Sequence, residues 1–511
     1  MVRIVFLFVF GSLALRGLSS VVSFRAPEII PPVQSLTYAA DVEVRLDAAQ
    51  TVSVSCGETD AADWIRNHLK LWFRFEPKVV TVSCDFATWT LGDEGYRLSA
   101  KPDGVLVEAK TLQGVRYALF TLRQIAERDS SGATVAYYRL PQLAIEDSPA
   151  LRFRGIHFCW FPEQSVDLVE REIRLAAFYK YNVVVLEPWG VFRSERHPWF
   201  GWPNAPMTKD VVRRLVATAK DLGVTLVPQF NIFGHASASR SCTGKHAALD
   251  VHPERESLFE PGGGLRGAMS SAWNWCLSNP SAVQVVKDIV VEMHEAFGNP
   301  PYFHIGCDEA EEPSCANCRA APYARLVANH ILGIGKLLKG HGARTMIWHD
   351  MLLDRGDSRW AKPEGATQRI RANGTKETAA ILQLLPKDIV ICDWYYGCGL
   401  AKYPTLEYFT ESGFDTLTCP FKDSMGIQKQ GFYAREHGLF GLLQTTWTII
   451  GGEDFPRLLQ TAAEVAWGGD ILVNKGHFAS VWRRVGWDMG TASYRDAGWY
   501  DTQVSRDIQG R

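Results

Sequence analysis

Two adjacent carboxylates are the residues of this chain best suited to chemistry. Asp308 and Glu309 lie in YFHIGCDEAEE, directly after an apolar, strand-like run. Successive side chains of a strand point to opposite faces, so both carboxylates reach one pocket only if the strand ends there. In a desolvated aromatic pocket the pKa of the less well hydrogen-bonded acid rises, which leaves one proton donor beside one anion. Cleavage of a glycosidic bond needs that division of roles. The alternative is a solvated loop end, and the preceding strand and His-x-Gly favour the catalytic interpretation.

Eight short, almost wholly apolar runs follow Asp147-Ser148-Pro149, with helical stretches between them. Such runs are typical of parallel strands covered by helices on both faces. Eight of them predict a (β/α)8 TIM barrel, a fold of the α/β class. Residues 236–280, between the third and fourth runs, are expected to form a loop over the barrel mouth. The eight runs are Arg154–Cys159, Asn182–Leu186, Val224–Phe230, Tyr302–Gly306, Arg344–Trp348, Asp388–Trp394, Phe414–Cys419 and Gly438–Gln444.

Polar and aromatic residues follow the predicted strands. In TIM barrels the chemistry lies at the carboxyl ends of the strands, so these side chains are expected to share one rim. They are His157, Glu187, Trp189, Gln229, Asn231, His235, Asp308, Glu309, Trp348, Asp350, Asp393, Trp394, Tyr395, Tyr396, Gln444 and Trp447.

Two segments precede the barrel, which we assign to residues 148–511. Residues 1–23 carry Arg3, a short apolar run and then small residues, which is typical of a signal peptide. The mature protein is therefore expected to start near Phe24 and to be exported, either to the periplasm or as a secreted protein. Residues 24–147 alternate strand-like and helical stretches and predict a small α+β domain. No later stretch has the length of a membrane helix.

The composition narrows the classes of partner. Lys and Arg number 54 against 56 Asp and Glu, so no excess of basic residues favours nucleic acid or an anionic membrane. The chain has 17 Trp, whose flat faces suit sugar rings. We predict no cofactor and no metal site, because HExxH and paired-His spacings are absent. Cys315 and Cys318 form one CxxC motif without a second Cys or His pair, which favours a local disulfide or packing.

The motif around the carboxylates resembles that of glycoside hydrolase family 20, the β-N-acetylhexosaminidases, whose signature is His-x-Gly-Gly-Asp-Glu. His304, Gly306, Asp308 and Glu309 match it, with Cys307 in place of the second Gly. Residues 114–124 also resemble an element of the small domain that precedes the barrel in this family. The resemblance implies a (β/α)8 barrel and a retaining mechanism in which the substrate supplies the nucleophile.

The resemblance implies roles for named residues. Glu309 would be the general acid and base, and Asp308 would orient the acetamido group that attacks the anomeric carbon to form an oxazolinium intermediate. Arg154 would hold the 3- and 4-hydroxyls, and three Trp residues would surround the acetamido methyl and the sugar face. The expected substrate-binding residues are Arg154, Glu187, His235, His304, Trp348, Asp350, Trp394, Tyr395, Tyr396 and Trp447.

The chain also departs from the family pattern. Gln229 and Asn231 stand where acids are usual, although His235 keeps its place. The acid that braces this histidine is absent from its usual position, and Glu187 is the candidate substitute. The seventh predicted strand carries no Tyr for the acetamido oxygen, so Tyr395 or Tyr396 is expected to replace it.

These observations predict an exported exo-β-N-acetylhexosaminidase acting on oligosaccharides or glycoconjugates that end in β-linked GlcNAc or GalNAc. Two alternatives stay open. One is another acetamido-dependent glycosidase, releasing a disaccharide or a sulfated GlcNAc. The other is a sugar-binding protein on a decayed barrel, which the amides Gln229 and Asn231 suggest and the intact Asp308–Glu309 pair disfavours. Neither nucleic acid nor a membrane span is expected.

Overall fold

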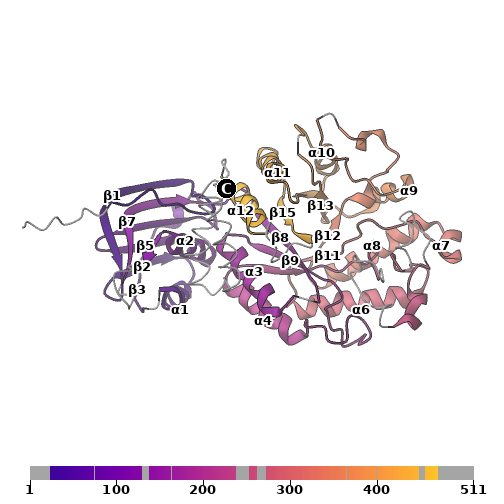
Figure 1. Ribbon diagram of the computed structural model, residues 1–511, viewed down its shortest axis with the longest axis horizontal. Coiled ribbons are helices and arrows are strands. Elements are labelled where there is room, and N and C mark those ends of the chain that lie inside the picture. Colours follow the sequence, from indigo (N-terminus) through magenta and orange to yellow (C-terminus); the bar gives the residue numbers. More distant parts are fainter. Residues whose placement is uncertain are drawn as a thin grey trace, which may run out of the picture.

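A computed structural model describes residues 23–469, apart from residues 74, 129–136, 163, 238–251, 262–271, 364, 399 and 448–454. Two units lie side by side along the long axis, a small α+β unit and a larger barrel (Figure 1). The predicted signal peptide lies outside the described residues, except for Ser23. In the described part of the chain, no helix has the length and apolar character needed to cross a membrane.

The small unit is a mixed sheet with helices on one face. Its strands pair in the order β1-β7-β4-β5-β2-β3, and β6 pairs with β7. A β-hairpin lies near the middle of this sheet, where β4 pairs antiparallel with β5 from Tyr96↔Ala109 to Lys101↔Gly104. The elements are β1 (Ser35–Leu46), β2 (Thr51–Cys56), α1 (Ala61–Phe73), β3 (Lys78–Thr81), η1 (Phe86–Thr88), β4 (Tyr96–Lys101), β5 (Gly104–Ala109), α2 (Leu112–Ile125), β6 (Glu127–Arg128) and β7 (Tyr138–Asp147).

Helix α2 lies between the two units, and nearly all of its residues are buried. Thr111 caps its amino end by accepting a hydrogen bond from the N–H of Gly114. Toward the barrel, Tyr117 lies edge-on to Trp467, with ring centroids 5.0 Å apart, and Phe120 lies 6.0 Å from Phe178. The small unit is therefore packed against the outer helices of the barrel.

The second sheet confirms the predicted barrel. Its eight strands are ordered β10-β9-β8-β15-β14-β13-β12-β11, and neighbouring strands run parallel. The barrel closes where Gln229 bridges His304 and the N–H of Phe230 donates to the carbonyl of His304 at 2.9 Å. The strands are β8 (Phe153–Trp160), β9 (Val183–Pro188), β10 (Thr225–Pro228), β11 (Tyr302–His304), β12 (Arg344–Trp348), β13 (Val390–Trp394), β14 (Asp415–Cys419) and β15 (Gly441–Thr445).

Helices surround the barrel, and Figure 1 shows them outside the strands. Apolar residues of the strands fill the barrel interior, among them Val185, Val227, Met346 and Leu443. The helical elements are α3 (Val166–Phe178), α4 (Lys209–Asp221), η2 (Pro253–Leu258), α6 (Pro280–Ala296), α7 (Ala316–Ala320), α8 (Tyr323–Gly340), η3 (Asp350–Leu352), η4 (Ser358–Trp360), α9 (Lys376–Ala379), η5 (Ala380–Leu384), α10 (Pro404–Glu411), α11 (Ser424–Glu436) and α12 (Phe455–Trp467).

The fourth strand is shorter than predicted. It ends at His304 instead of Gly306, because Gly306 and Cys307 adopt φ angles of 65° and 75°, in the left-handed region that no strand uses. A Cβ built on Gly306 would lie 1.3 Å from Oδ1 of Asn231, so only glycine fits there. The strand therefore ends just before Asp308 and Glu309.

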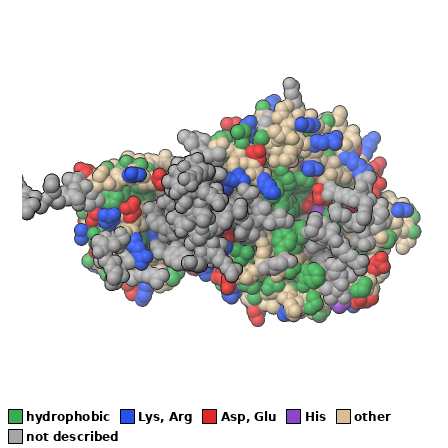
Figure 2. Space-filling model, viewed as in Figure 1, with side chains coloured by type: hydrophobic (Ala, Val, Ile, Leu, Met, Phe, Trp, Pro, Cys, Tyr) green, Lys and Arg blue, Asp and Glu red, His purple; other side chains and the backbone are tan. Residues whose placement is uncertain are grey.

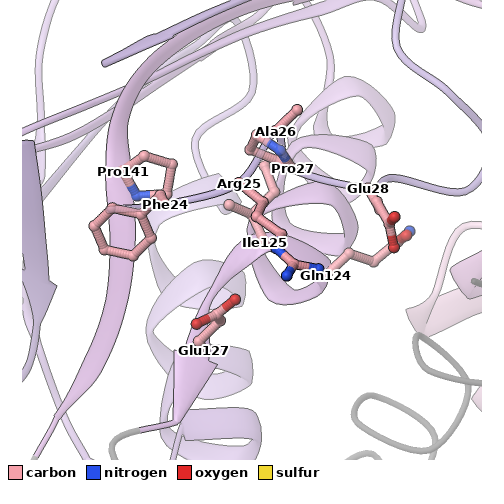
Figure 3. A pocket seen from close by; sticks show the side chains of 9 residues that line it. All are labelled: Phe24, Arg25, Ala26, Pro27, Glu28, Gln124, Ile125, Glu127 and Pro141. Atoms are coloured by element: carbon pink, nitrogen blue, oxygen red, sulfur yellow. The ribbon is translucent and has the colours of Figure 1, made fainter. Parts of the chain in front are cut away.

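The first residues after the predicted signal peptide pack on the small unit. The side-chain amide of Gln124 accepts the N–H of Ile30 at 2.7 Å and donates to its carbonyl at 2.6 Å. A cavity of about 190 Å³ lies there, where Phe24 and Pro141 are side by side (Figure 3). It is separate from the strand ends of the barrel. We propose that the small domain ends at Asp147, where β7 ends, and that the barrel domain follows it.

Basic and acidic side chains are interspersed on the face drawn in Figure 2. This distribution agrees with the balanced formal charge of −2.

Candidate active site

A pocket of about 240 Å³ opens at the carboxyl ends of the barrel strands. It is smaller than the roughly 300–1,000 Å³ of sites for drug-sized ligands, so it suits one compact unit such as a single sugar. The loops after β9, β10, β11, β12, β13 and β15 supply its wall. The lining residues are Trp189, His235, Asp308, Glu309, Arg371, Trp394, Tyr396 and Trp447.

The two carboxylates face this pocket together. The side chain of Asp308 is 5% exposed and that of Glu309 is 22% exposed. Nε2 of His235 lies 3.4 Å from Oδ2 of Asp308 and 3.4 Å from Oε2 of Glu309. Glu309 has a φ of 49°, so the chain has left the strand conformation and both neighbours reach the same pocket. The predicted geometry of the pair is thus present.

A third carboxylate, Asp350, holds the backbone of Glu309 from behind. Its Oδ2 accepts the N–H of Glu309 at 2.8 Å and Nδ2 of Asn373 at 2.7 Å. Its Oδ1 accepts Nε1 of Trp394 at 3.3 Å. Burial, and then the negative charge of Asp308, raise the pKa of Asp350 to about 6. Asp350 is fully buried and is not among the residues that line the pocket, so its predicted contact with substrate stays a prediction, and its hydrogen bonds hold Glu309 and Trp394.

His235 and Glu309 are also held by Trp273, which the sequence analysis did not single out. The ring of Trp273 lies against that of His235, with centroids 4.2 Å apart. Its Nε1 donates to the carbonyl oxygen of Glu309 at 2.8 Å. Trp273 belongs to the loop predicted over the mouth, and the Trp content of that loop was the signal that could have found it.

The aromatic wall is built from three of the predicted residues. The rings of Trp394 and Tyr396 pack at a tilt of 30° with centroids 5.1 Å apart, and Nε1 of Trp447 donates to the hydroxyl of Tyr396 at 2.7 Å. Burial raises the pKa of Tyr396 well above its usual value, so its hydroxyl stays protonated. The wall thus offers flat apolar faces together with one hydroxyl.

Comparison with known proteins identifies the family. Residues 26–148 match the model of glycosyl hydrolase family 20, domain 2, and residues 200–469 match that of the family 20 catalytic domain. The chain belongs to glycosyl hydrolase family 20. Strands β8 and β9 precede the part matched by the catalytic-domain model.

Family 20 relatives differ considerably in sequence. A beta-hexosaminidase of Vibrio furnissii is 25% identical over 359 residues, which cover 61% of this chain and 55% of that protein. A lacto-N-biosidase of Bifidobacterium bifidum is 24% identical over 314 residues, covering 60% of this chain and 25% of that protein. The chain spans about half the length of the first two curated relatives, 55% and 45%.

Solved structures of family 20 share the fold. An inactive mutant of the exo β-N-acetylglucosaminidase of Vibrio harveyi superposes with a TM-score of 0.67 at 18% identity, covering 92% of this chain and 78% of that one. The β-N-acetylhexosaminidase of Bacteroides fragilis gives 0.65 at 19% identity, covering 92% and 98%.

Arg154, which the resemblance assigns to the 3- and 4-hydroxyls of the sugar, is not among the residues that line the pocket. It lies at the amino end of β8, on the side opposite the pocket. All five of its N–H donors are used: by both oxygens of Glu94, by the hydroxyl of Tyr117, and by the carbonyls of Lys180 and Leu151. It joins the small unit to the barrel and has no donor left for a sugar.

The two tyrosines that follow β13 differ in their surroundings. Trp394 and Tyr396 are two residues apart and share the pocket side, whereas Tyr395 points the other way. The hydroxyl of Tyr395 donates to the carbonyl of Gln368 at 3.3 Å, and its ring packs against Tyr403. Of the two predicted tyrosines, Tyr396 lines the pocket and Tyr395 does not.

Three other predicted residues lie beneath the pocket instead of lining it. Trp348 is fully buried in the barrel interior, 5.7 Å from the ring of Trp447. His304 is also buried, packs on Trp348 at 4.3 Å, and accepts the N–H of Gly306 through Nδ1 at 3.0 Å. Glu187 is buried and faces Nε2 of His157 at 3.1 Å. These residues pack beneath the wall and the end of β11, and their predicted contact with substrate stays a prediction.

Arg371 lines the pocket and was not predicted. It is exposed, and its guanidinium lies 5.9 Å from the ring of Trp394. It belongs to a polar stretch after β12 without periodicity, so the sequence carried no signal for it. It adds a positive charge to a pocket that also contains two carboxylates.

Proposed function

We propose that the chain is a retaining exo-β-N-acetylhexosaminidase that removes a terminal β-linked GlcNAc or GalNAc from an oligosaccharide or glycoconjugate. The observation that carries this proposal is the placement of Asp308 and Glu309 in one small aromatic pocket of a family 20 barrel. The volume of that pocket favours a single terminal sugar.

In the proposed first step, Glu309 donates its proton to the glycosidic oxygen as the bond to the anomeric carbon breaks. The carbonyl oxygen of the 2-acetamido group attacks that carbon and forms a cyclic oxazolinium ion. Positive charge then grows on the acetamido nitrogen, where Asp308 stabilises it. In the second step, Glu309 takes a proton from water as the water opens the ring, which restores the configuration and the acid. His235, within 3.4 Å of both carboxylates, orients them.

The test compares chromogenic β-glycosides of GlcNAc, GalNAc and glucose. We expect hydrolysis of the first two and near inertness of the glucoside, which lacks the acetamido nucleophile. A thiazoline mimic of the oxazolinium ion is expected to bind far more tightly than GlcNAc. Efficient glucoside cleavage, or a glycosyl ester trapped on the protein, would overturn the mechanism.

Arg371 favours a second candidate, a hexosaminidase for sulfated GlcNAc. A guanidinium at the pocket wall matches a sulfate oxygen as a charge-assisted donor. The measurement is kcat/KM for 6-sulfo-GlcNAc against unmodified GlcNAc on the same leaving group. A preference for the sulfated sugar supports this candidate, and a preference for the neutral sugar rejects it.

We also propose that residues 1–23 direct export and are removed. The amino-terminal sequence of the protein recovered from a native host tests this, with a start near Phe24 expected.

A further inference from the structure

Three cysteines and one glutamate from distant parts of the chain meet beside the catalytic loop. Glu260 follows η2, Cys276 precedes α6, and Cys315 and Cys318 begin α7. One possible ligand atom from each residue lies within 4.8 Å of the others. The CxxC motif alone did not predict a metal site, because its partners lie 39 and 55 residues earlier in the sequence.

Two of the three sulfur–sulfur distances match the edge of a tetrahedron around a metal ion. Sγ of Cys276 lies 3.8 Å from Sγ of Cys315 and 4.0 Å from Sγ of Cys318. A zinc–sulfur bond of about 2.3 Å gives a tetrahedral edge of about 3.8 Å between two sulfurs. A disulfide would place one pair at about 2.05 Å, and none of the three cysteines is in one.

The surrounding hydrogen bonds orient these groups as outer partners of a metal site do. The N–H of Cys318 donates to Sγ of Cys315 at 3.2 Å, which fixes the CxxC turn at the start of α7. Oε2 of Glu260 accepts the N–H groups of Ser314 and Cys315 at 2.8 and 2.7 Å. Oε1 of Glu260 is buried and accepts no hydrogen bond from a described N–H or O–H group. Ser278 Oγ lies 3.1 Å from Sγ of Cys318.

We propose that Glu260, Cys276, Cys315 and Cys318 bind one Zn²⁺ ion in a closed, structural site. Thiolates select zinc over the harder Mg²⁺ and Ca²⁺, and four protein ligands leave no position for substrate. The ion therefore takes no part in the chemistry.

The site ties together the two loops that hold Glu309. Cys276 lies three residues after Trp273, whose Nε1 bonds the carbonyl of Glu309. Between them, the side chain of Asn274 donates to the carbonyl of Glu311 at 2.7 Å and accepts its N–H at 3.1 Å. Zinc at this place would fix the loop after β10 to the loop after β11, and hence the position of the catalytic acid.

The deciding experiment is the metal content of the untagged full-length protein, measured by plasma mass spectrometry. We expect about one zinc per chain in the wild type and in the control Cys398→Ser, whose cysteine lies outside the cluster. Cys315→Ser and Cys318→Ser should each lose most of the zinc. Replacement by Co²⁺ should give thiolate-to-cobalt absorption and the strong visible bands of a tetrahedral site.

If the serine variants do not fold, the zinc content and cobalt absorption of the wild-type protein still test the proposal. A wild type without zinc that also gives no cobalt–thiolate absorption overturns it. So does a disulfide between any two of the three cysteines in non-reduced peptide mapping. Because metal content is measured without substrate, this result is independent of the proposed glycosidase activity.

Discussion

Asp350→Asn tests the positioning role of the buried carboxylate. Three N–H donors converge on Asp350, from Glu309, Asn373 and Trp394. An amide has one acceptor oxygen, so one donor must then face the amide NH2 group. The oxygen is expected to keep the two shorter bonds and lose the 3.3 Å bond from Trp394. Losing a hydrogen bond to a charged group costs about 1.5–3 kcal/mol.

The pH dependence of the unfolding free energy gives a more specific prediction for Asp350→Asn than the loss of one hydrogen bond. Burial raises the pKa of Asp350 to about 6, whereas an Asp in an unfolded chain has a pKa of about 3.9. Between these values the folded protein binds more protons than the unfolded one, so the unfolding free energy of the wild type falls as pH rises. A difference of about 2 pKa units corresponds to about 3 kcal/mol. Asparagine does not titrate, and at pH 4 part of the unfolded-state Asp is already ionised, so Asp350→Asn gains about 2 kcal/mol relative to the wild type between pH 4 and pH 7.

Urea unfolding followed by Trp fluorescence at pH 4 and pH 7 measures this gain. Asp41→Asn, an exposed carboxylate of β1, is the matched control and should show no comparable change. At pH 7 the Asp350 variant should lose about tenfold or more in kcat with little change in KM, since Asp350 positions Glu309 without contacting substrate. A stability gap that is the same at both pH values would refute the buried titration, and an unchanged kcat would refute the positioning role.

Four further substitutions test the remaining assignments. Glu309→Gln should lower turnover by about 10²–10⁴, and less for a nitrophenolate than for a sugar leaving group; equal losses would contradict the acid role. Asp308→Asn should lower kcat more than it raises KM and move the basic limb of the kcat/KM profile to lower pH; a wild-type kcat with an unmoved limb would make Asp308 structural. Arg371→Ala should lower kcat/KM at least tenfold more for a sulfated than for a neutral GlcNAc substrate, if the second candidate function is correct. Arg154→Met should lower the unfolding free energy by about 3 kcal/mol in urea, because Glu94 and Tyr117 lose their buried partner. At low temperature, where the variant stays folded, its KM should equal that of the wild type. A raised KM would instead place Arg154 in the sugar site.

The sequence alone determined the barrel and the place of its acids. Short apolar runs report burial on both faces locally, so eight of them were enough to predict eight parallel strands. Gly306 before Asp308 and Glu309 marked the end of a strand, and the left-handed backbone there brings both carboxylates into one pocket. These features depend on residues close together in the chain, and pattern analysis can find them.

The tertiary structure decided which side chains line the pocket and which support it. Trp348 and Trp394 both end strands, yet Trp348 lies in the barrel interior and Trp394 reaches the pocket. Arg154 lies at the start of its strand beside the small unit, where it forms an ion pair with Glu94. Arg371 carried no local signal, and the CxxC motif of Cys315 and Cys318 did not reveal Cys276 and Glu260 as its neighbours. Their neighbours come from distant segments, so their contacts depend on how loops fold over the barrel, and residue spacing within one segment contains no information about that packing.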